Sequence, residues 1–357
     1  MTWLGEQLGR IADDMPVRDL AARAIAVHQR RRRNFMALAA AAVVVITMIA
    51  VTVAVRALPG EPRAAARPSA PPELPVIKVG MLPTVESAPV YVAQSEGYFQ
   101  EEGLTVEPVA VTGAAAATPQ VAAGMLDLAY TDYATLFRAN EKGKDFTIVA
   151  GLYRSAPEDL AIVVSAKSKI RTVRELKRKK IAIPNLGGLG QLTVTAALKR
   201  AGLKPRDVVM AEKPYPEMLR ALSTGQFDAA LLAEPFVTVG REGGRLRIVA
   251  DAIPPEFTDL HTAGMAATAQ WVRKHPRTLA AFQRALAKAQ HLIASDPRRV
   301  REVMPTYTKT SPKEAAVMTF GSYPAELDMA ELKRVADLAH AHGFTERPAD
   351  LGSAVGG

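Results

Sequence analysis

The alternation of strand-like and helix-like segments from residue 76 onward constrains the fold of this chain most strongly. Short apolar runs, typical of buried strands, are separated by segments with helical spacing. This alternation predicts mostly parallel sheets with helices on both faces. The runs predicted as strands are residues 76–82, 105–111, 126–130, 146–152, 159–164, 181–184, 208–211, 227–233, 246–250 and 261–267. Beyond residue 267 the pattern is almost entirely helical.

Polar or glycine-rich loops follow four of these strands, at residues 84–88, 112–115, 131–133 and 186–191. In open α/β sheets, ligands bind at the carboxyl ends of strands and at helix N-termini, where backbone N–H groups are unpaired. We therefore expect these loops to converge on a ligand. Their candidate ligand-binding residues are Thr84, Ser87, Ala88, Thr112, Gly113, Thr131, Asp132, Tyr133, Gly187, Gly188, Gly190 and Gln191.

Charged residues at strand ends add to this set. Arg154 is the best candidate for a cationic ligand partner, although most arginines are simply solvated. Asp132 either accepts a hydrogen bond from an amine or caps its own helix. Glu234, followed by Pro235 and Phe236, either contacts a ligand or caps the next helix. Ser87 is positioned to cap the helix that starts at residue 88.

Three tyrosines are candidates for stacking on a ring-shaped ligand, namely Tyr91, Tyr133 and Tyr153, whereas Tyr98 and Phe99 are expected in the core. The glycines at 187, 188 and 190 follow neither the dinucleotide fingerprint nor the P-loop pattern, which disfavours a nucleotide site. Either the backbone approaches a small ligand closely there, or the loop is a structural turn. Residues 172–175 and 311–314 each fit a helix capping box.

Composition excludes several classes of chemistry. The chain has no cysteine, which rules out disulfides, thiolate metal sites, cysteine nucleophiles and a lipid-modified cysteine. His340 and His342 would point apart on a helix, so we expect no metal site. No nucleophile has a base near it in sequence, so we expect neither catalytic residues nor a cofactor. The net charge is +9 without a basic stripe interleaved with aromatics, which disfavours nucleic acid as a partner.

An uncharged apolar stretch occupies residues 35–55 and is long enough, at about 30 Å as a helix, to cross a membrane. Four arginines at 30–33 precede it, so the positive-inside rule predicts a cytoplasmic segment at 1–34. A cleaved signal peptide is the competing interpretation, but its apolar core is usually only about 7–15 residues. We therefore favour an uncleaved transmembrane helix, followed by a Pro/Ala-rich linker at 56–75.

The exact residues at positions 81–104, MLPTVESAPVYVAQSEGYFQEEGL, indicate a family more specifically than the strand–helix–strand pattern does. It resembles the start of the periplasmic binding proteins of ABC importers for aliphatic sulfonates, taurine, nitrate and thiamine-type pyrimidines. In that family P-V-Y-V-A, G-Y-F and E-G-L follow the first strand in this order. Gly124-x-x-Asp127 and Glu234-Pro235-Phe236 fit the same family, and the resemblance covers about residues 77–342.

The resemblance implies an α/β fold, a two-lobed type II periplasmic-binding-protein clamp with mostly parallel sheets, here preceded by one transmembrane helix. It places lobe I at 76–164 and 256–345, lobe II at 165–255 and a flexible tail at 346–357. The strands at 159–164 and 261–267 would be the two hinge crossovers. A solute bound between the lobes would stabilise the closed form, and the membrane subunits of the transporter would recognise that form.

The implied function is that of a membrane-anchored extracytoplasmic solute-binding component of an ABC importer. It would capture a small sulfonate, taurine, nitrate or pyrimidine-type solute, with permease and ATPase subunits as partners, and it would not be an enzyme. Because the anchor differs from the family's usual lipid tether or free form, a membrane-tethered ligand sensor is the alternative. The pyrimidine-synthesising relatives rely on cysteine-containing motifs, which this chain lacks.

Overall fold

The computed structural model describes residues 70–253 and 255–355. The predicted cytoplasmic segment at 1–34, the predicted transmembrane helix at 35–55 and most of the linker at 56–75 lie outside the described residues, so these remain predictions. Within the part that the structure describes, no helix combines the length and the hydropathy that a membrane crossing requires.

The first sheet has five strands in the order β2-β1-β3-β10-β4. Strand β1 (Val76–Met81) lies parallel between β2 (Thr105–Ala110) and β3 (Leu128–Asp132). Strand β10 (His261–Thr268) runs antiparallel to both β3 and β4 (Phe146–Arg154). Because β10 fills an interior position of the sheet, lobe I is completed only after the chain has returned from the second sheet.

The second sheet, which defines lobe II, has the order β7-β6-β8-β5-β9. Strand β6 (Lys180–Ile183) lies parallel between β7 (Val209–Glu212) and β8 (Ala229–Ala233). Strand β5 (Leu160–Ser165) runs antiparallel to β8 and to β9 (Leu246–Asp251). Each sheet therefore carries a single antiparallel strand in an interior position, so both sheets are mixed, with two parallel and two antiparallel pairings each, where mostly parallel sheets were predicted.

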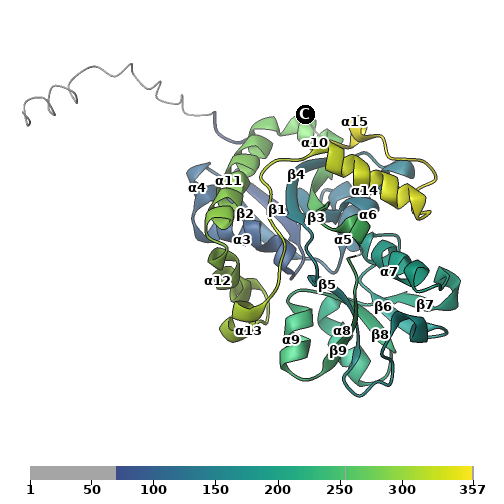
Figure 1. Ribbon diagram of the computed structural model, residues 1–357. Coiled ribbons are helices and arrows are strands. Elements are labelled where there is room, and N and C mark those ends of the chain that lie inside the picture. Colours follow the sequence, from purple (N-terminus) through teal and green to yellow (C-terminus); the bar gives the residue numbers. More distant parts are fainter. Residues whose placement is uncertain (1–69, 254, 356–357) are drawn as a thin grey trace, which may run out of the picture. The chain divides into compact units, whose positions relative to one another are not determined.

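Helices cover the two sheets (Figure 1). The 20-residue helix α11 packs against α3 and α4, where Phe99 stacks on Phe282 with ring centroids 5.5 Å apart. Phe99 is fully buried, as predicted. The helices are α3 Ala88–Ser95, α4 Tyr98–Glu101, α5 Ala114–Ala122, α6 Tyr133–Glu141, α7 Leu189–Arg200, α8 Tyr215–Ser223, α9 Phe236–Glu242, α10 Ala269–Lys274, α11 Pro276–Ser295, α12 Arg298–Tyr307, α13 Pro312–Val317, α14 Met329–Ala341 and α15 Leu351–Ala354.

The central strands are buried on both faces, as strands with helices on either side must be. Strand β8 reads Ala-Ala-Leu-Leu-Ala and has no polar residue, and all five of its residues are buried. Its partner β5 is apolar up to its final serine. Because both faces of these strands are buried, apolar and polar residues do not alternate in their sequences.

The boundary between the lobes differs from the prediction. The sequence assigned residues 159–164 to lobe I, but β5 pairs with β8 and β9 and is part of the second sheet. The chain crosses between the lobes in the loops at 155–159 and 252–260, which precede β5 and β10 in the sequence. They are joined where Ser155 Oγ donates to the carbonyl of Phe257 at 2.8 Å.

A third segment, residues 308–324, also connects the lobes, and sequence analysis missed it. Helix α13 packs against α9 of lobe II, and the chain then runs back to β4 of lobe I (Figure 1). There the N–H of Arg154 donates to the carbonyl of Ser322 at 2.9 Å. A short amphipathic helix in sequence does not reveal which lobe it packs against.

Both ends of the described chain are attached to lobe I, contrary to two predictions. The final linker residues are docked on α11, where Leu74 N donates to Thr278 Oγ1 at 3.0 Å. The predicted flexible tail at 346–357 contains helix α15, whose Ala354 is 2% exposed, and Val355 pairs with Ile148 of β4. Leu74 packs partly buried against the core and Ala354 is buried, and the sequence does not show either contact.

The two predicted capping boxes have different outcomes. At α13, Ser311 Oγ accepts from Glu314 N at 3.3 Å and the Glu314 carboxylate accepts from Ser311 N at 2.8 Å, so this prediction is confirmed. At residues 172–175 it is wrong, because Thr172 makes no side-chain cap and the segment forms only a 3₁₀ turn, Val173–Leu176. There the Glu175 carboxylate accepts from Arg171 N instead.

Candidate functional site

The four loops predicted to converge meet between the two sheets. The N–H of Val85 in lobe I donates to the carbonyl of Glu234 in lobe II at 3.1 Å. Gly113 faces Asn185, because a Cβ atom at Gly113 would lie 3.4 Å from Asn185 Oδ1. The carboxyl ends of the strands in the two sheets therefore face each other across an interlobe cleft.

Asp132 joins the two lobes directly. Its Oδ1 atom accepts from the N–H of Thr135 at 2.9 Å, which caps α6, and from the N–H of Leu189 at 2.9 Å, which caps α7 of lobe II. Its Oδ2 atom accepts from Thr135 Oγ1 at 2.7 Å. Burial raises the pKa of Asp132, although these hydrogen bonds oppose the rise. The N-terminus of α7, one of the places where a ligand was predicted, is thus occupied by the chain's own carboxyl.

The glycine-rich loop before α7 owes its composition to contacts within the protein. Gly187 has φ +77°, and a Cβ there would overlap the guanidinium of Arg138 from lobe I. A Cβ at Gly190 would lie 2.9 Å from Leu231 in β8. Gln191 Oε1 accepts from Gly187 N at 2.7 Å within the loop. The close backbone approach that the glycines indicated is therefore an approach to other parts of this chain.

A cavity of about 20 Å³ lies between the lobes, and two of its lining residues carry carboxyl groups. This volume admits about one water molecule, so a larger solute reaches these groups only when the lobes move apart. The described residues that line it include no lysine, arginine or histidine. They are Val85, Glu86, Tyr153, Ser155, Asp159, Leu160, Leu189, Ala233, Ile253 and Thr262.

Glu86 is the carboxyl that lobe I contributes to this cavity. Burial raises its pKa to about 7, and the nearby Asp159 and Asp132 add to the rise. Hydrogen bonds from Tyr130 and from Thr84 Oγ1, the latter at 3.1 Å, oppose it without cancelling it. Glu86 therefore keeps its proton to a higher pH than an exposed glutamate does.

Asp159 is the second carboxyl, at the point where the first crossing enters lobe II. Tyr153 Oη donates to its Oδ2 atom at 2.7 Å, and Ala156 N donates at 2.9 Å. Burial raises its pKa to about 7, with Asp251 and Glu234 adding to the rise. Sequence analysis named neither Glu86 nor Asp159 as a site residue, although Glu86 falls within the predicted loop at 84–88.

Glu234 is 1% exposed and serves as a helix cap. Its carboxylate accepts from Thr238 N at 3.0 Å and from Thr238 Oγ1 at 2.7 Å, in the first turns of α9. Burial raises the pKa of Glu234 as well, opposed by these two bonds. The helix-capping alternatives for Asp132 and Glu234 are therefore both present in the structure. Ser87 is different, because its hydroxyl forms no cap at α3.

Tyrosines from the C-terminal segment hold the loop at 84–88. Tyr307 Oη donates to the carbonyl of Thr84 and Tyr323 Oη to that of Val85, each at 3.0 Å. Tyr91 stacks on Tyr307, with ring centroids 3.9 Å apart. The remaining predicted stacking residues also contact protein rings, Tyr153 on Tyr323 and Tyr133 on Phe137.

Arg154 is already paired with a carboxylate. Its Nη2 atom lies 2.6 Å from Glu331 Oε1 on α14 and 3.3 Å from His261 Nε2. It does not line the interlobe cavity. Among residues 70–253 and 255–355, no group of three His, Asp or Glu side chains is arranged to hold a metal ion.

The other predicted residues lie around the same cleft. Thr84 is fully buried and bonded to Glu86, and Thr131 Oγ1 donates to the carbonyl of Asp132 at 3.0 Å. Thr112 is exposed, whereas Ala88 is fully buried. Gly188 lies against Asn185 and Thr135. Direct contact of any of these residues with a solute stays a prediction.

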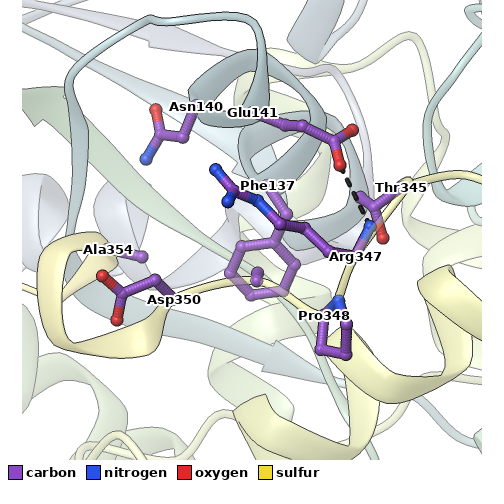
Figure 2. Close-up of a pocket in the computed structure, with 9 residues that line it drawn as sticks. Phe137, Asn140, Glu141, Thr345, Arg347, Pro348, Asp350 and Ala354 are labelled. Carbon is purple, nitrogen blue, oxygen red and sulfur yellow. Dashed lines mark hydrogen bonds between the residues drawn. The ribbon is translucent and has the colours of Figure 1, made fainter.

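A separate cavity of about 410 Å³ lies beside α6 and the C-terminal segment (Figure 2). Glu141 Oε1 accepts there from the N–H of Glu346 at 2.7 Å and from that of Arg347 at 3.3 Å. None of the predicted site residues lines this cavity. The candidate solute site is therefore the interlobe cleft.

Comparisons with known proteins agree with this geometry. The family model described as NMT1/THI5 like matches residues 84–300, more than half of the chain. The 4-amino-5-hydroxymethyl-2-methylpyrimidine phosphate synthase THI13 of Saccharomyces cerevisiae is 24% identical over 226 residues, covering 60% of this chain and 65% of that relative. Riboflavin-binding protein RibY of Chloroflexus aurantiacus is 25% identical over 236 residues, covering 63% and 64%. The chain thus spans just under two thirds of the length of these relatives.

Among solved structures, the alkanesulfonate-binding protein SsuA from Xanthomonas axonopodis pv. citri, bound to MOPS, has a TM-score of 0.67. It is 18% identical, and the match covers 80% of this chain and 99% of SsuA. This likeness shows the fold, the two-lobed α/β clamp of periplasmic binding proteins.

Proposed function

Because the chain belongs to the NMT1/THI5-like family, we propose that it is the membrane-anchored, extracytoplasmic solute-binding component of an ABC importer. The observation that carries this proposal is the interlobe cleft, where loops from both lobes bring buried polar groups together. Small-molecule sites are concave, with a few convergent polar groups. The partners of such a component are a small solute and the permease and ATPase subunits of the importer.

The mechanism follows from contacts between the lobes. Asp132 with Leu189 and Val85 with Glu234 hold the two sheets together in the closed form. A solute that touches both lobes adds contacts that exist only when the clamp is closed, and so it shifts the population toward that form. The permease subunits then recognise the closed clamp.

The solute belongs to the range of sulfonates, taurine, nitrate and pyrimidine-type compounds. Within this range the cleft favours compounds with nitrogen-bound protons, such as taurine or an aminopyrimidine, over nitrate and simple sulfonates. The reason is that carboxyl groups accept hydrogen bonds from N–H groups, whereas they repel anions. The N-terminus of α7 is already capped by Asp132.

The proposed location is the outer face of a cell membrane, with residues 35–55 as the anchor and residues 1–34 in the cytoplasm. The charge-free stretch and the arginines before it support this orientation. A membrane-tethered sensor with the same clamp is the alternative. Co-purification of the full chain with permease subunits supports the importer, and co-purification with a regulator bound to residues 1–33 supports the sensor.

Catalysis is the second class of function, because the yeast relative is named as a pyrimidine phosphate synthase. The present chain has no cysteine and therefore no thiol nucleophile or thiolate ligand for such a reaction. We propose binding without turnover. Mass spectrometry of a compound recovered after incubation with the protein decides this point, since a chemically changed compound contradicts the proposal.

Thermal unfolding of the full-length chain in mild detergent tests solute capture. The panel holds alkanesulfonates, taurine, nitrate and aminopyrimidines. A ligand at 100 times its dissociation constant adds about 2.7 kcal/mol of stability, which raises the Tm by several degrees. A saturable shift with one class supports capture of that class. A folded protein that responds to no member of the panel contradicts the assignment to these solutes.

A further inference from the structure

The interlobe cavity places two carboxyl groups in one small space. Glu86 comes from lobe I and Asp159 from the start of lobe II, and both line the same cavity of about 20 Å³. The charge of Asp159 helps to raise the pKa of Glu86, so the two carboxyl groups are close enough to repel when both are ionised. Among the described residues of the lining, none supplies a positive charge.

A buried hydroxyl beside Glu86 has no partner. Ser87 is fully buried, it follows Glu86 in the turn that borders the cavity, and its Oγ atom has no hydrogen-bond partner among the described residues. It occupies the N-cap position of α3 without capping it. A buried polar atom without a partner is unfavourable, so a ligand that forms a hydrogen bond with it gains affinity.

Two of the positive groups nearby are occupied elsewhere. The positive end of the α7 helix dipole is directed at Asp132, since Leu189 N donates to its carboxyl at 2.9 Å. The guanidinium of Arg154 is paired with Glu331 at 2.6 Å. An anion that enters the cleft therefore meets two carboxyl groups and no free cation in the cavity lining.

We propose that this cleft is selective for an organic cation, a protonated amine or amidine whose N–H groups lie between Glu86 and Asp159, with Ser87 as a third polar partner. This inference rests on the proposed solute-binding function and specifies its substrate class. A single positive charge compensates the repulsion between the two carboxylates. The energetic gain is largest in this partly dry cleft, where water screens charges weakly.

Binding of a cation at this site is coupled to the protonation of the two carboxyl groups. Glu86 is faced by Thr84, Tyr130, Asp132 and Asp159. A bound cation lowers the pKa of both carboxyl groups, so binding near neutral pH releases protons and affinity rises with pH.

A second set of groups faces Asp159. These are Tyr153, Ala156 N, Asp251 and Glu234. They include no positive charge, so a bound cation would add a charge that favours the ionised form of Asp159.

Isothermal titration of the full-length chain tests the proposal. The cations are benzamidine and ethanolamine, the neutral isostere is benzamide, and the anions are nitrate and ethanesulfonate. We expect saturable binding of a cation, at least tenfold tighter at pH 8 than at pH 6, and no binding of its neutral isostere. Titration in two buffers with different ionisation enthalpies measures the released protons.

Glu86→Gln and Asp159→Asn are the test variants, because both keep the shape of the side chain and remove its charge. Each is expected to weaken cation binding at least tenfold. Glu107→Gln on exposed strand β2 is the matched control and should bind as the unchanged protein does. Melting curves establish that every variant is folded.

The outcomes separate the two proposals. Saturable binding of an anion or a neutral compound, without any cation, overturns the cation inference and leaves solute capture standing. Cation binding that is unchanged in both charge-removing variants also overturns the inference. If no compound of any charge binds to the folded protein, solute capture fails together with the inference.

Discussion

The carboxyl of Asp132 in lobe I accepts a hydrogen bond from the N–H of Leu189 in lobe II at 2.9 Å. One side chain therefore caps two helices, its own helix α6 and helix α7 of the other lobe. Capping by a carboxylate is favourable because the first N–H groups of a helix have no partner within the helix. This contact can form only when the clamp is closed, so it contributes to the closed state before any solute does.

Replacement of Asp132 by alanine should both destabilise the protein and open the clamp. Loss of the two caps is expected to cost about 1–3 kcal/mol. Urea unfolding measures the stability, and small-angle X-ray scattering measures the opening as an increased radius of gyration.

Asp328→Ala is the matched control for this change. Asp328 caps α14 by accepting from Ala330 N and Glu331 N, and neither of these residues belongs to lobe II. It should lower stability by about 1 kcal/mol without changing the radius of gyration. Equal radii for the Asp132 and Asp328 variants would contradict the role of Asp132 as a bridge between the lobes.

Gly187→Ala should disturb lobe closure. Gly187 has φ +77°, and its added Cβ would overlap the guanidinium of Arg138 from the other lobe. We expect a loss of about 1–2 kcal/mol from the left-handed backbone, and in addition a more open clamp. Gly202→Ala separates the two effects, because Gly202 has φ +78° and open space around its Cα. If both variants scatter alike, Gly187 has no role in closure.

The stability of the unliganded protein should fall as the pH rises from about 5 to 8. Burial raises the pKa of Glu86 and that of Asp159 to about 7, so the folded state holds protons that the unfolded chain releases near pH 4–4.5. The stabilisation is complete below the unfolded pKa values and is lost as the pH passes through about 7. Each group contributes on the order of 3 kcal/mol.

Urea unfolding at pH 5, 6, 7 and 8 measures this dependence. The double variant Glu86→Gln, Asp159→Asn should show a flatter profile, because its amides do not titrate. A wild-type profile as flat as that of the double variant would show that these carboxyl groups are already ionised at low pH.

Glu73 should anchor the end of the linker to lobe I. Its carboxylate accepts from the backbone N–H of Arg277 at 3.0 Å and from that of Thr278 at 2.7 Å, at the start of α11. Burial alone would raise its pKa, but these bonds lower the pKa of Glu73 to about 2. Its stabilisation is therefore present above pH 4.5 and is lost as the pH falls toward 2.

Glu73→Ala is expected to cost about 1 kcal/mol at pH 7, measured by urea unfolding. Glu101→Ala is the matched control, since Glu101 forms only an exposed ion pair with Lys288 and should cost less than about 0.5 kcal/mol. A Glu73 effect no larger than that of Glu101 would show that the linker end is not held by this carboxylate.

The sequence predicted the elements better than it predicted the contacts between them. Buried strands are recognisable because helices on both faces of a sheet require continuous apolar runs, as in β5 and β8. The loops at the strand ends were recognisable for a similar reason, since polar residues and glycines interrupt those runs. The sequence did not show which strands pair with one another, and so β5 was assigned to the wrong lobe.

The site shows the same division. Its location followed from the sequence, because parallel strands place their carboxyl ends, and the loops after them, on one edge. Whether each charged side chain is free or paired within the protein did not follow from the sequence. Arg154 looked available for a ligand but pairs with Glu331, which is 177 residues away in the chain.

The sequence by itself therefore determined the α/β class, the family and the edge of the sheets where a solute is expected. Tertiary structure alone decided which charges are neutralised inside the protein and which face the cleft. The carboxyl of Asp132 accepts a hydrogen bond from Leu189 N within the protein. Glu86 and Asp159, in contrast, line one cavity whose described lining contains no cation. The physical reason is that strand and helix formation depend on neighbours in sequence, whereas the ionisation of a carboxyl depends on burial and on charges brought close by folding.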